Sequence, residues 1–184
     1  MKKLIILRGN SGSGKTSVSK ELQKRFGRNT MLISQDMVRR EILCVKDGIG
    51  TKALPLLISL LEYGKRNSEI TILEGILDSA WYRPLFQKAV EAYGTNIYAF
   101  YYDLPFEETL LRHETKPNRD EFGEEVMRSW WKEKDYLDII PERILTKDIS
   151  FADTVDMICE CVDEKDRGGY DDRPERGARN DTVL

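Results

Sequence analysis

The sequence predicts a single three-layer α/β domain in which helices cover both faces of a parallel β-sheet. Short runs rich in apolar and β-branched residues alternate along the chain with longer segments of helical period. The first such run, residues 4–7, leads directly into a glycine-rich turn and then into a helical pattern. The length of 184 residues suits one domain with a substantial core.

The glycine-rich turn matches the phosphate-binding pattern G-x-x-x-x-G-K-T and reads Gly9-Asn10-Ser11-Gly12-Ser13-Gly14-Lys15-Thr16. Its glycines let the backbone wrap closely around a polyphosphate and point N–H groups toward it. The helix that follows adds the positive end of its dipole. Lys15 supplies a mobile charge for the β- and γ-phosphates, and the Thr16 hydroxyl is expected to ligate Mg²⁺. These eight residues are the predicted nucleotide-binding loop.

Further strands are predicted where apolar and β-branched residues cluster, at 30–33, 70–75, 96–102 and 143–146. Helices are predicted at 17–26, 34–41, 51–62, 81–93, 106–112, 124–137 and from 150 to about 162. Ser34 is placed to cap a helix, and Gly94 follows a segment whose helix it is expected to end. Strands that alternate with helices favour an all-parallel sheet.

Two segments lack the pattern of a packed element. Residues 113–123 are polar, and we expect a mobile loop there. From Asp163 onward, charged and glycine residues dominate, and such a segment cannot bury enough apolar surface to offset its ordering entropy. We therefore expect a folded domain over residues 1–162 and a disordered or loosely attached tail over 163–184.

The composition bounds the partners and the compartment. A net charge of −3 gives no overall field that would recruit nucleic acid or a membrane surface, although a local basic patch stays possible. No apolar run approaches the ~18 residues of a membrane span. The apolar residues after Met1 are too few for a signal peptide, and we interpret them as the first strand. A cytoplasmic protein without a membrane partner is expected.

The chain has three cysteines, Cys44, Cys159 and Cys161. An odd, low count without a disulfide framework suits a reducing cytosol. Cys159 and Cys161 resemble a C-x-C ligand pair, but two positions apart in a helix their side chains point to different faces. The chain also has a single histidine, so a metal site at these cysteines is not favoured.

The accessory motifs narrow the class of nucleotide-binding protein. The guanine motif N-K-x-D of GTPases and the L-S-G-G-Q signature of transporter ATPases are both absent. The string D-E-F-G at 120–123 resembles a GTPase motif but lies in a polar segment and not after a strand. Motor-type ATPases usually have a longer chain and a strand ending in Asp-Glu, whereas here that strand ends in Glu74-Gly75. Of the nucleotide-binding classes compared, the small P-loop kinases agree best with these motifs.

Charged side chains follow the ends of two predicted strands. Asp36 and Arg39 come just after the second strand, and Glu74 ends the third, where an unpartnered buried carboxylate would be costly. The carboxyl ends of parallel strands form the edge at which open α/β sheets bind ligands. Phosphoryl transfer depends on positioning and on charge neutralisation, with a carboxylate able to accept the proton of the attacking hydroxyl.

These motifs together resemble the zeta-toxin and polynucleotide 5′-kinase branch of the P-loop kinases, and chloramphenicol phosphotransferases share much of the pattern. The matching strings are G-N-S-G-S-G-K-T, D-M-V-R-R, I-L-E-G-I-L and Y-Y-D-L-P-F-E-E-T-L-L-R-H, and the resemblance covers Met1 to about Val162. It implies a P-loop NTPase fold with a five-stranded parallel sheet in the order 2-3-1-4-5. It also implies a helical lid over about 112–123.

The resemblance implies a role for each matching residue. Asp36 corresponds to the catalytic carboxylate that lies near Mg²⁺ and accepts the proton of the attacking hydroxyl. Arg39 matches the D-x-x-R arginine that contacts the substrate phosphate, and Glu74 matches the strand-end glutamate that contacts substrate. Arg112 and Arg119 resemble the lid arginines that close over the transferred phosphate.

The expected activity is transfer of the γ-phosphate of ATP, with Mg²⁺, to a hydroxyl of a small-molecule or nucleoside-like acceptor. Three alternatives stay open: a polynucleotide 5′-kinase, against which the overall acidity argues mildly, a toxin-like protein held by an antitoxin, and a regulatory nucleotide-binding protein with little transfer activity. The residues do not specify the acceptor, the oligomeric state or a preference for ATP over GTP.

Overall fold

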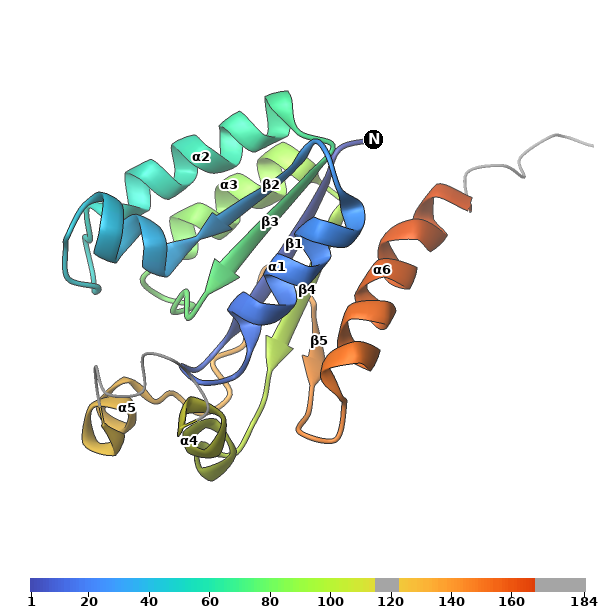
Figure 1. The fold of residues 1–184 in the computed structure, drawn as a ribbon. Coiled ribbons are helices and arrows are strands. Elements are labelled where there is room, and N and C mark those ends of the chain that lie inside the picture. The colour runs from blue at the N-terminus through green and yellow to red at the C-terminus, as the bar shows by residue number, and fades with distance from the viewer. Residues whose placement is uncertain (115–122, 168–184) are drawn as a thin grey trace, which may run out of the picture.

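The structure, a computed structural model, describes residues 1–114 and 123–167. Its centre is a five-stranded parallel sheet in the order β2-β3-β1-β4-β5 (Figure 1). The strands are β1 (Lys3–Gly9), β2 (Thr30–Ser34), β3 (Ile70–Gly75), β4 (Ile97–Tyr102) and β5 (Glu142–Leu145). The predicted fold class and the predicted strand order are both confirmed.

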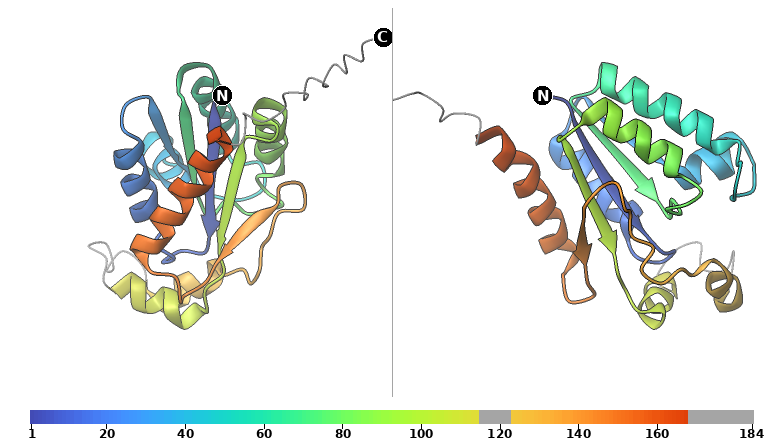
Figure 2. Two further views of the ribbon diagram at one scale, coloured as in Figure 1. Left: turned by 90° about the vertical axis from the view of Figure 1, so that its right-hand side faces the viewer. Right: turned by 180° about the vertical axis from the view of Figure 1, so that it is seen from behind.

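Helices cover both faces of the sheet. They are α1 (Lys15–Phe26), the π-helix η1 (Met37–Ile42), α2 (Ala53–Asn67), α3 (Arg83–Tyr93), α4 (Phe106–Glu114), α5 (Glu124–Trp130) and α6 (Phe151–Arg167). The helices α1 and α6 lie on one face and α2 and α3 on the other, as the views in Figures 1 and 2 both show. The short helices α4 and α5 lie beyond the carboxyl ends of the strands (Figure 1).

The central strand β1 explains why the layers assemble in this way. All of its residues are buried, as expected for a strand with neighbours on both sides and helices on both faces. Leu4 and Ile6 belong to the core that β1 shares with α2 and α3. Ile5 and Leu7 belong to the opposite core, with side chains of α1 and α6. The alternation of side chains along a strand thus divides one apolar run between two cores.

The structure corrects the predicted ends of several helices. The helix predicted over 124–137 ends at Trp130, and its cap residue Trp131 is extended. The backbone N–H of Lys132 donates to the Asn10 side chain instead of continuing the helix, so a tertiary hydrogen bond prevails over helical periodicity. The helices predicted to end at 62 and at about 162 continue to Asn67 in α2 and to Arg167 in α6. The rest of the predicted tail, 168–184, lies outside the described residues.

The segment predicted as a helix at 34–41 forms the π-helix η1. Such helices are rare and occur frequently at functional sites. The Ser34 side chain accepts a hydrogen bond from the Met37 N–H at 3.5 Å, close to the predicted capping arrangement. No helix in the described part of the chain has the length and apolar character needed to cross a bilayer.

Candidate active site

The carboxyl ends of four strands meet at one edge of the sheet. Ser34 at the end of β2 lies in register with Glu74 of β3, and Gly9 at the end of β1 lies in register with Tyr102 of β4. The phosphate-binding loop runs from β1 into α1 at this same edge. The side chains that the sequence singled out at strand ends are thereby brought to the loop.

The loop has a backbone that only glycine adopts without strain. Gly9, Gly12 and Gly14 have φ angles of 139°, 84° and 98°. A Cβ atom at Gly12 would lie 2.4 Å from the carbonyl oxygen of Thr109, so α4 packs directly against the loop. A Cβ atom at Gly9 would lie 2.8 Å from the Cβ atom of Tyr102. Two of the three glycines are therefore required by close packing as well as by backbone conformation.

Lys15 folds back over the loop from the first position of α1. Its side chain is buried, and Nζ donates hydrogen bonds to the Asn10 carbonyl oxygen at 2.8 Å and to Ser13 Oγ at 3.0 Å. The helix begins at the loop, because the N–H groups of Ser17 and Val18 both donate to the Gly14 carbonyl at 3.1 Å. The ammonium group and the positive end of α1 thus lie where a polyphosphate would bind.

Glu74 lies beside Thr16. The glutamate is 2% exposed, and both of its carboxylate oxygens lie 3.3 Å from the Thr16 hydroxyl. The Ser34 hydroxyl donates to the same carboxylate at 2.5 Å. The Thr16 and Ser34 hydroxyls are neutral partners of this buried carboxylate, so a cation bound next to it would be favourable.

Thr16 and Glu74 fit a magnesium ion. Mg²⁺ prefers oxygen ligands and usually combines one or two protein ligands with phosphate oxygens and water. Within residues 1–114 and 123–167, no group of three or more His, Cys, Asp or Glu side chains comes together that could hold a metal by itself. A hydroxyl and one carboxylate beside a phosphate loop are the ligand set that a nucleotide-bound Mg²⁺ needs.

Asp36, the residue before η1, forms an ion pair with Arg39, which lies in the first turn of η1. Arg39 Nη2 donates to Asp36 Oδ1 at 2.8 Å, and the Asp36 side chain is 56% exposed. The Nε atom of Arg39 is buried and has no hydrogen-bond partner in this arrangement. Asp36 lies two residues beyond Ser34, so the pair occupies the β2 side of the site. The predicted catalytic carboxylate and the predicted substrate arginine are therefore adjacent.

Arg112 is the predicted lid arginine that the structure describes. It comes from α4, and its Nη1 donates to the Ser13 carbonyl at 3.0 Å while its Nε donates to Glu108 at 2.6 Å. The guanidinium therefore lies against the phosphate-binding loop. The second predicted lid arginine, Arg119, lies outside the described residues, as does the predicted lid between 115 and 122.

A cavity of about 450 Å³ adjoins the loop on its α6 side. Its walls include Gly12–Gly14, Arg112, Tyr102 and residues 149–151 at the start of α6. Burial raises the pKa of Tyr102 to about 12, and the positive charge of Arg112 opposes this shift. The cavity could not be predicted from sequence, because its walls come from segments more than 130 residues apart in the chain.

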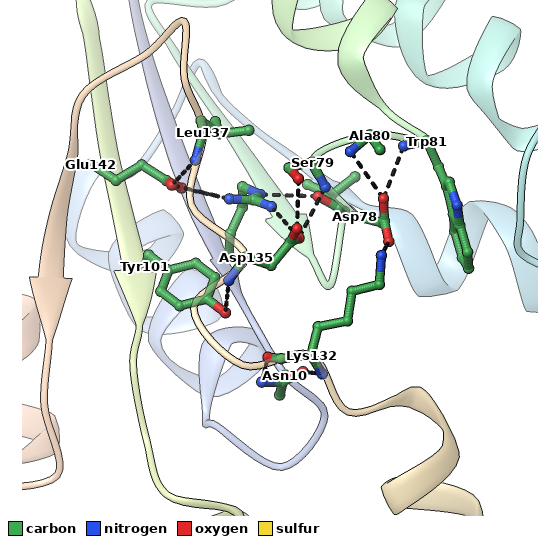
Figure 3. Close-up of polar contacts among 12 residues, drawn as sticks. Asn10, Asp78, Ser79, Ala80, Trp81, Tyr101, Lys132, Asp135, Leu137 and Glu142 are labelled. Carbon is green, nitrogen blue, oxygen red and sulfur yellow. Dashed lines mark hydrogen bonds and ion pairs between the residues drawn. The ribbon is translucent and has the colours of Figure 1, made fainter.

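A polar network around Arg8, next to the phosphate-binding loop, was also not predicted from the sequence. Arg8, the residue before Gly9, is fully buried. It donates to both carboxylate oxygens of Glu142 at 2.9 and 3.0 Å, to Asp135 at 2.8 Å and to the Leu77 carbonyl at 3.0 Å. Figure 3 shows Asp135 and Glu142 in this network, with Asn10 lying beside Lys132. An arginine at the end of a buried strand was the available signal.

The profile of a protein family described as AAA domain (AAA_33) matches residues 4–135. The chain belongs to this family. The search of curated proteins found no significant match. The match covers the phosphate-binding loop, both acidic strand ends and α4, so the candidate site lies within the family's domain.

Solved structures share the fold of this AAA domain family member at low sequence identity. A gluconokinase from Sinorhizobium meliloti 1021 is 14% identical with a TM-score of 0.66, over 91% of this chain and 98% of that one. The APS kinase of Mycobacterium tuberculosis, solved with AMPPNP and APS, is 19% identical with a TM-score of 0.58, over 90% and 98%. The tunicamycin resistance protein of Deinococcus radiodurans is 16% identical with a TM-score of 0.59, over 88% and 96%.

These likenesses confirm that the chain has the fold of the small P-loop kinases. They do not select the zeta-toxin and polynucleotide kinase branch, which stays a prediction. At these identities the shared property is the fold, and the chemistry has to be argued from the side chains of this chain.

Proposed function

We propose that this protein is an ATP-dependent phosphotransferase that moves the γ-phosphate, with Mg²⁺, to a hydroxyl of a small-molecule or nucleoside-like acceptor. The observation that carries the proposal is the buried Glu74 carboxylate 3.3 Å from the Thr16 hydroxyl, directly behind the phosphate-binding loop. A loop alone binds phosphate, whereas a loop with an adjacent buried carboxylate also provides for a metal ion.

Two cations act on the phosphates. Lys15 lies within the loop and is placed to exchange its bond to the Asn10 carbonyl for phosphate oxygens. Arg112 contacts the loop at the Ser13 carbonyl and adds a planar donor group there. Mg²⁺ held by Thr16 and Glu74 would supply further charge neutralisation. The proposed work of these residues is to orient the chain of phosphates and to stabilise the charge that develops on it.

Asp36 is the proposed base. As the acceptor oxygen bonds to the γ-phosphorus, the bond from that phosphorus to the β–γ bridging oxygen breaks and ADP leaves. The proton of the acceptor hydroxyl passes to the Asp36 carboxylate. Arg39 orients that carboxylate through its 2.8 Å hydrogen bond and offers its remaining donors to the acceptor. A catalytic residue that is half exposed suits a site into which an acceptor has yet to bind.

The nucleotide and the acceptor approach from different sides. The cavity of about 450 Å³ between the loop and the start of α6 suits the base and sugar of the nucleotide. The acceptor side is the region of η1 and Asp36.

The three cysteines are unpaired, which suits the reducing cytoplasm in which we place the protein.

The test is an acceptor screen with γ-labelled ATP and Mg²⁺, using small polyols, nucleosides and a 5′-hydroxyl oligonucleotide. We expect label transfer to a small acceptor and a loss on the order of a thousandfold in Lys15→Ala, because a charge aimed at the phosphates is removed. Lys20→Ala, at an exposed lysine on the same helix α1, is the matched control and should transfer normally. Undiminished transfer by Lys15→Ala would contradict the assignment.

The same screen, together with the purification itself, separates the other candidates. Strongly salt-dependent labelling of the oligonucleotide would favour a polynucleotide 5′-kinase. Steady ATP hydrolysis without any acceptor would favour a regulatory protein. Co-purification with a small protein that blocks the site would favour a toxin-like role.

A further inference from the structure

The side chain of Asn10 joins the phosphate-binding loop to the segment that follows α5. Asn10 Nδ2 donates to the Lys132 carbonyl at 2.7 Å, and the Lys132 N–H donates to Asn10 Oδ1 at 3.0 Å (Figure 3). The side-chain amide of Asn10 therefore forms hydrogen bonds with both backbone polar groups of Lys132. Because Lys15 also bonds to the Asn10 carbonyl, a displacement of Lys132 would be transmitted to the part of the loop that faces the phosphates.

The side chain of Lys132 extends in the other direction, to the loop between β3 and α3. Its ammonium group forms an ion pair with Asp78, whose side chain is 3% exposed, and it lies 5.0 Å from the ring centre of Trp81 (Figure 3). The second oxygen of Asp78 accepts the backbone N–H groups of Ala80 and Trp81, each at 2.9 Å. Asp78 thus shapes its own loop and anchors Lys132 at the same time.

A second contact reinforces this connection three residues further along. Asp135 accepts the N–H of Ser79 at 2.9 Å and the Ser79 hydroxyl at 2.5 Å, while Arg8 also donates to it at 2.8 Å. Residues 132–135 are therefore fixed to the β3–α3 loop at two points. Of these two points, the one at Lys132 continues to the phosphate-binding loop through Asn10.

The β3–α3 loop begins directly after Glu74 and Gly75. The strand β3 therefore carries the carboxylate next to Thr16, and the loop after it carries, four residues beyond Glu74, the carboxylate that holds Lys132. A chain of contacts therefore connects the segment after Glu74 to the phosphate-binding loop, from Asp78 through Lys132 to Asn10. The two halves of the proposed Mg²⁺–nucleotide site are linked through it as well as through the sheet.

We infer that Lys132 is a positioning residue, which holds the phosphate-binding loop in its nucleotide-binding geometry through Asn10 while its ammonium group is anchored by Asp78. Because this role presupposes the nucleotide binding proposed above, it is tested with Mg·ATP and needs no acceptor. The prediction that distinguishes it from a general effect on stability is non-additivity. Once the Asn10 amide is removed, loss of the Lys132 side chain should have no further effect on affinity.

The experiment measures the dissociation constant of Mg·ATP by titration calorimetry for the wild type, Asn10→Ala, Lys132→Met and the double variant. We expect each single variant to bind about tenfold more weakly and the double variant to bind no more weakly than Asn10→Ala. Lys132→Arg, which keeps a cation beside Asp78, should restore most of the affinity. Losses that simply multiply in the double variant would overturn the inference.

A neighbouring ion pair provides the matched control. Arg83 of α3 pairs with Asp138 at 2.8 Å and so joins the same two regions, but at an exposed position away from Asn10. Arg83→Met should leave Mg·ATP affinity unchanged, and an equal loss there and in Lys132→Met would overturn the inference.

A further variant guards against a failure to fold. Lys132→Met leaves the buried Asp78 charge unpaired, so Lys132→Met combined with Asp78→Asn removes both charges and should fold while still binding ATP weakly. Normal affinity in this folded variant would overturn the inference. Absence of Mg·ATP binding by the wild type would instead overturn the proposed function, so the two failures are distinguishable.

Discussion

The two sides of Glu74 are built in different ways. On the side of α1, most of the phosphate-binding loop is buried, and Gly9 and Gly12 are packed so closely that a methyl group would collide with backbone or Cβ atoms. On the side of η1, the side chains of Asp36 and Arg39 are paired with each other, and Asp36 is more than half exposed. The proposed nucleotide side is thus preformed, whereas the proposed acceptor side is open.

This difference suits a division of labour between affinity and specificity. Every kinase of this fold has to hold a polyphosphate, and a rigid backbone does so at little cost in ordering entropy. Acceptors differ from one kinase to another, so the residues that choose among them can vary on the same scaffold. We expect substitutions on the loop side to abolish nucleotide binding and substitutions on the η1 side to alter turnover.

The largest predicted effect is at Gly12. Gly12→Ala adds a Cβ atom 2.4 Å from the Thr109 carbonyl oxygen and should weaken Mg·ATP binding on the order of a hundredfold, because the loop has to move. Gly27→Ala is the matched control, since Gly27 also has a positive φ, of 73°, but has open space around it. The control should lose roughly 1–3 kcal/mol of stability and keep its ATP affinity. Equal ATP affinities in the two variants would show that the loop is not preformed.

A smaller and different effect is predicted at Asp36. Asp36→Asn should lower turnover by about 10²–10⁴-fold, because the proposed base is lost, and leave ATP affinity nearly unchanged. Thermal unfolding should change little, since an exposed ion pair contributes little to stability. Glu41→Gln, at an exposed carboxylate of η1, serves as the control. Matching losses of turnover and ATP affinity would assign Asp36 to the metal and not to proton transfer.

The smallest predicted effect concerns alkaline stability on the nucleotide side. Burial raises the pKa of Tyr102 to about 12, from about 10 in the unfolded chain. Between about pH 10 and pH 12 the folded state keeps a proton that the unfolded state has released, so the free energy of unfolding falls as pH rises. The contribution of Tyr102 to stability is therefore complete below about pH 10 and is lost as pH rises through about 12.

Denaturant unfolding at a series of pH values measures this contribution. Tyr102→Phe should lose roughly 1 kcal/mol less stability than the wild type between neutral pH and pH 11. Tyr63→Phe, at an exposed tyrosine of α2, should follow the wild type. Parallel curves for the wild type and Tyr102→Phe would show that Tyr102 titrates alike in both states.

The parts that sequence could predict are those coded by neighbouring residues. The loop from Gly9 to Thr16 is a contiguous pattern, and the alternation of strands and helices is a local signal that predicts a parallel sheet. The strand order followed from the resemblance to the P-loop kinases, and the structure confirms it. Glu74 was singled out because it ends a buried apolar run, although its contact with Thr16 required the sheet to be assembled.

The parts that sequence could not predict depend on contacts between distant segments. Nothing near Asn10 indicates that its amide binds the backbone of Lys132, and helical periodicity continued past Trp130 although the chain leaves the helix there. Likewise, Arg8 was visible only as a polar residue after a strand, and its two carboxylate partners lie more than 120 residues away. Such networks form after the fold brings the segments together.

The measurement that tests the central claim most directly is the dependence of ATP affinity on Mg²⁺ in the wild type and in Glu74→Gln. If Thr16 and Glu74 hold the metal beside the loop, Mg²⁺ should strengthen ATP binding by the wild type, and most of this gain should vanish in Glu74→Gln while metal-free ATP binds at least as well. An equal gain from Mg²⁺ in both proteins would contradict the account, because Glu74 would then have no part in holding the metal.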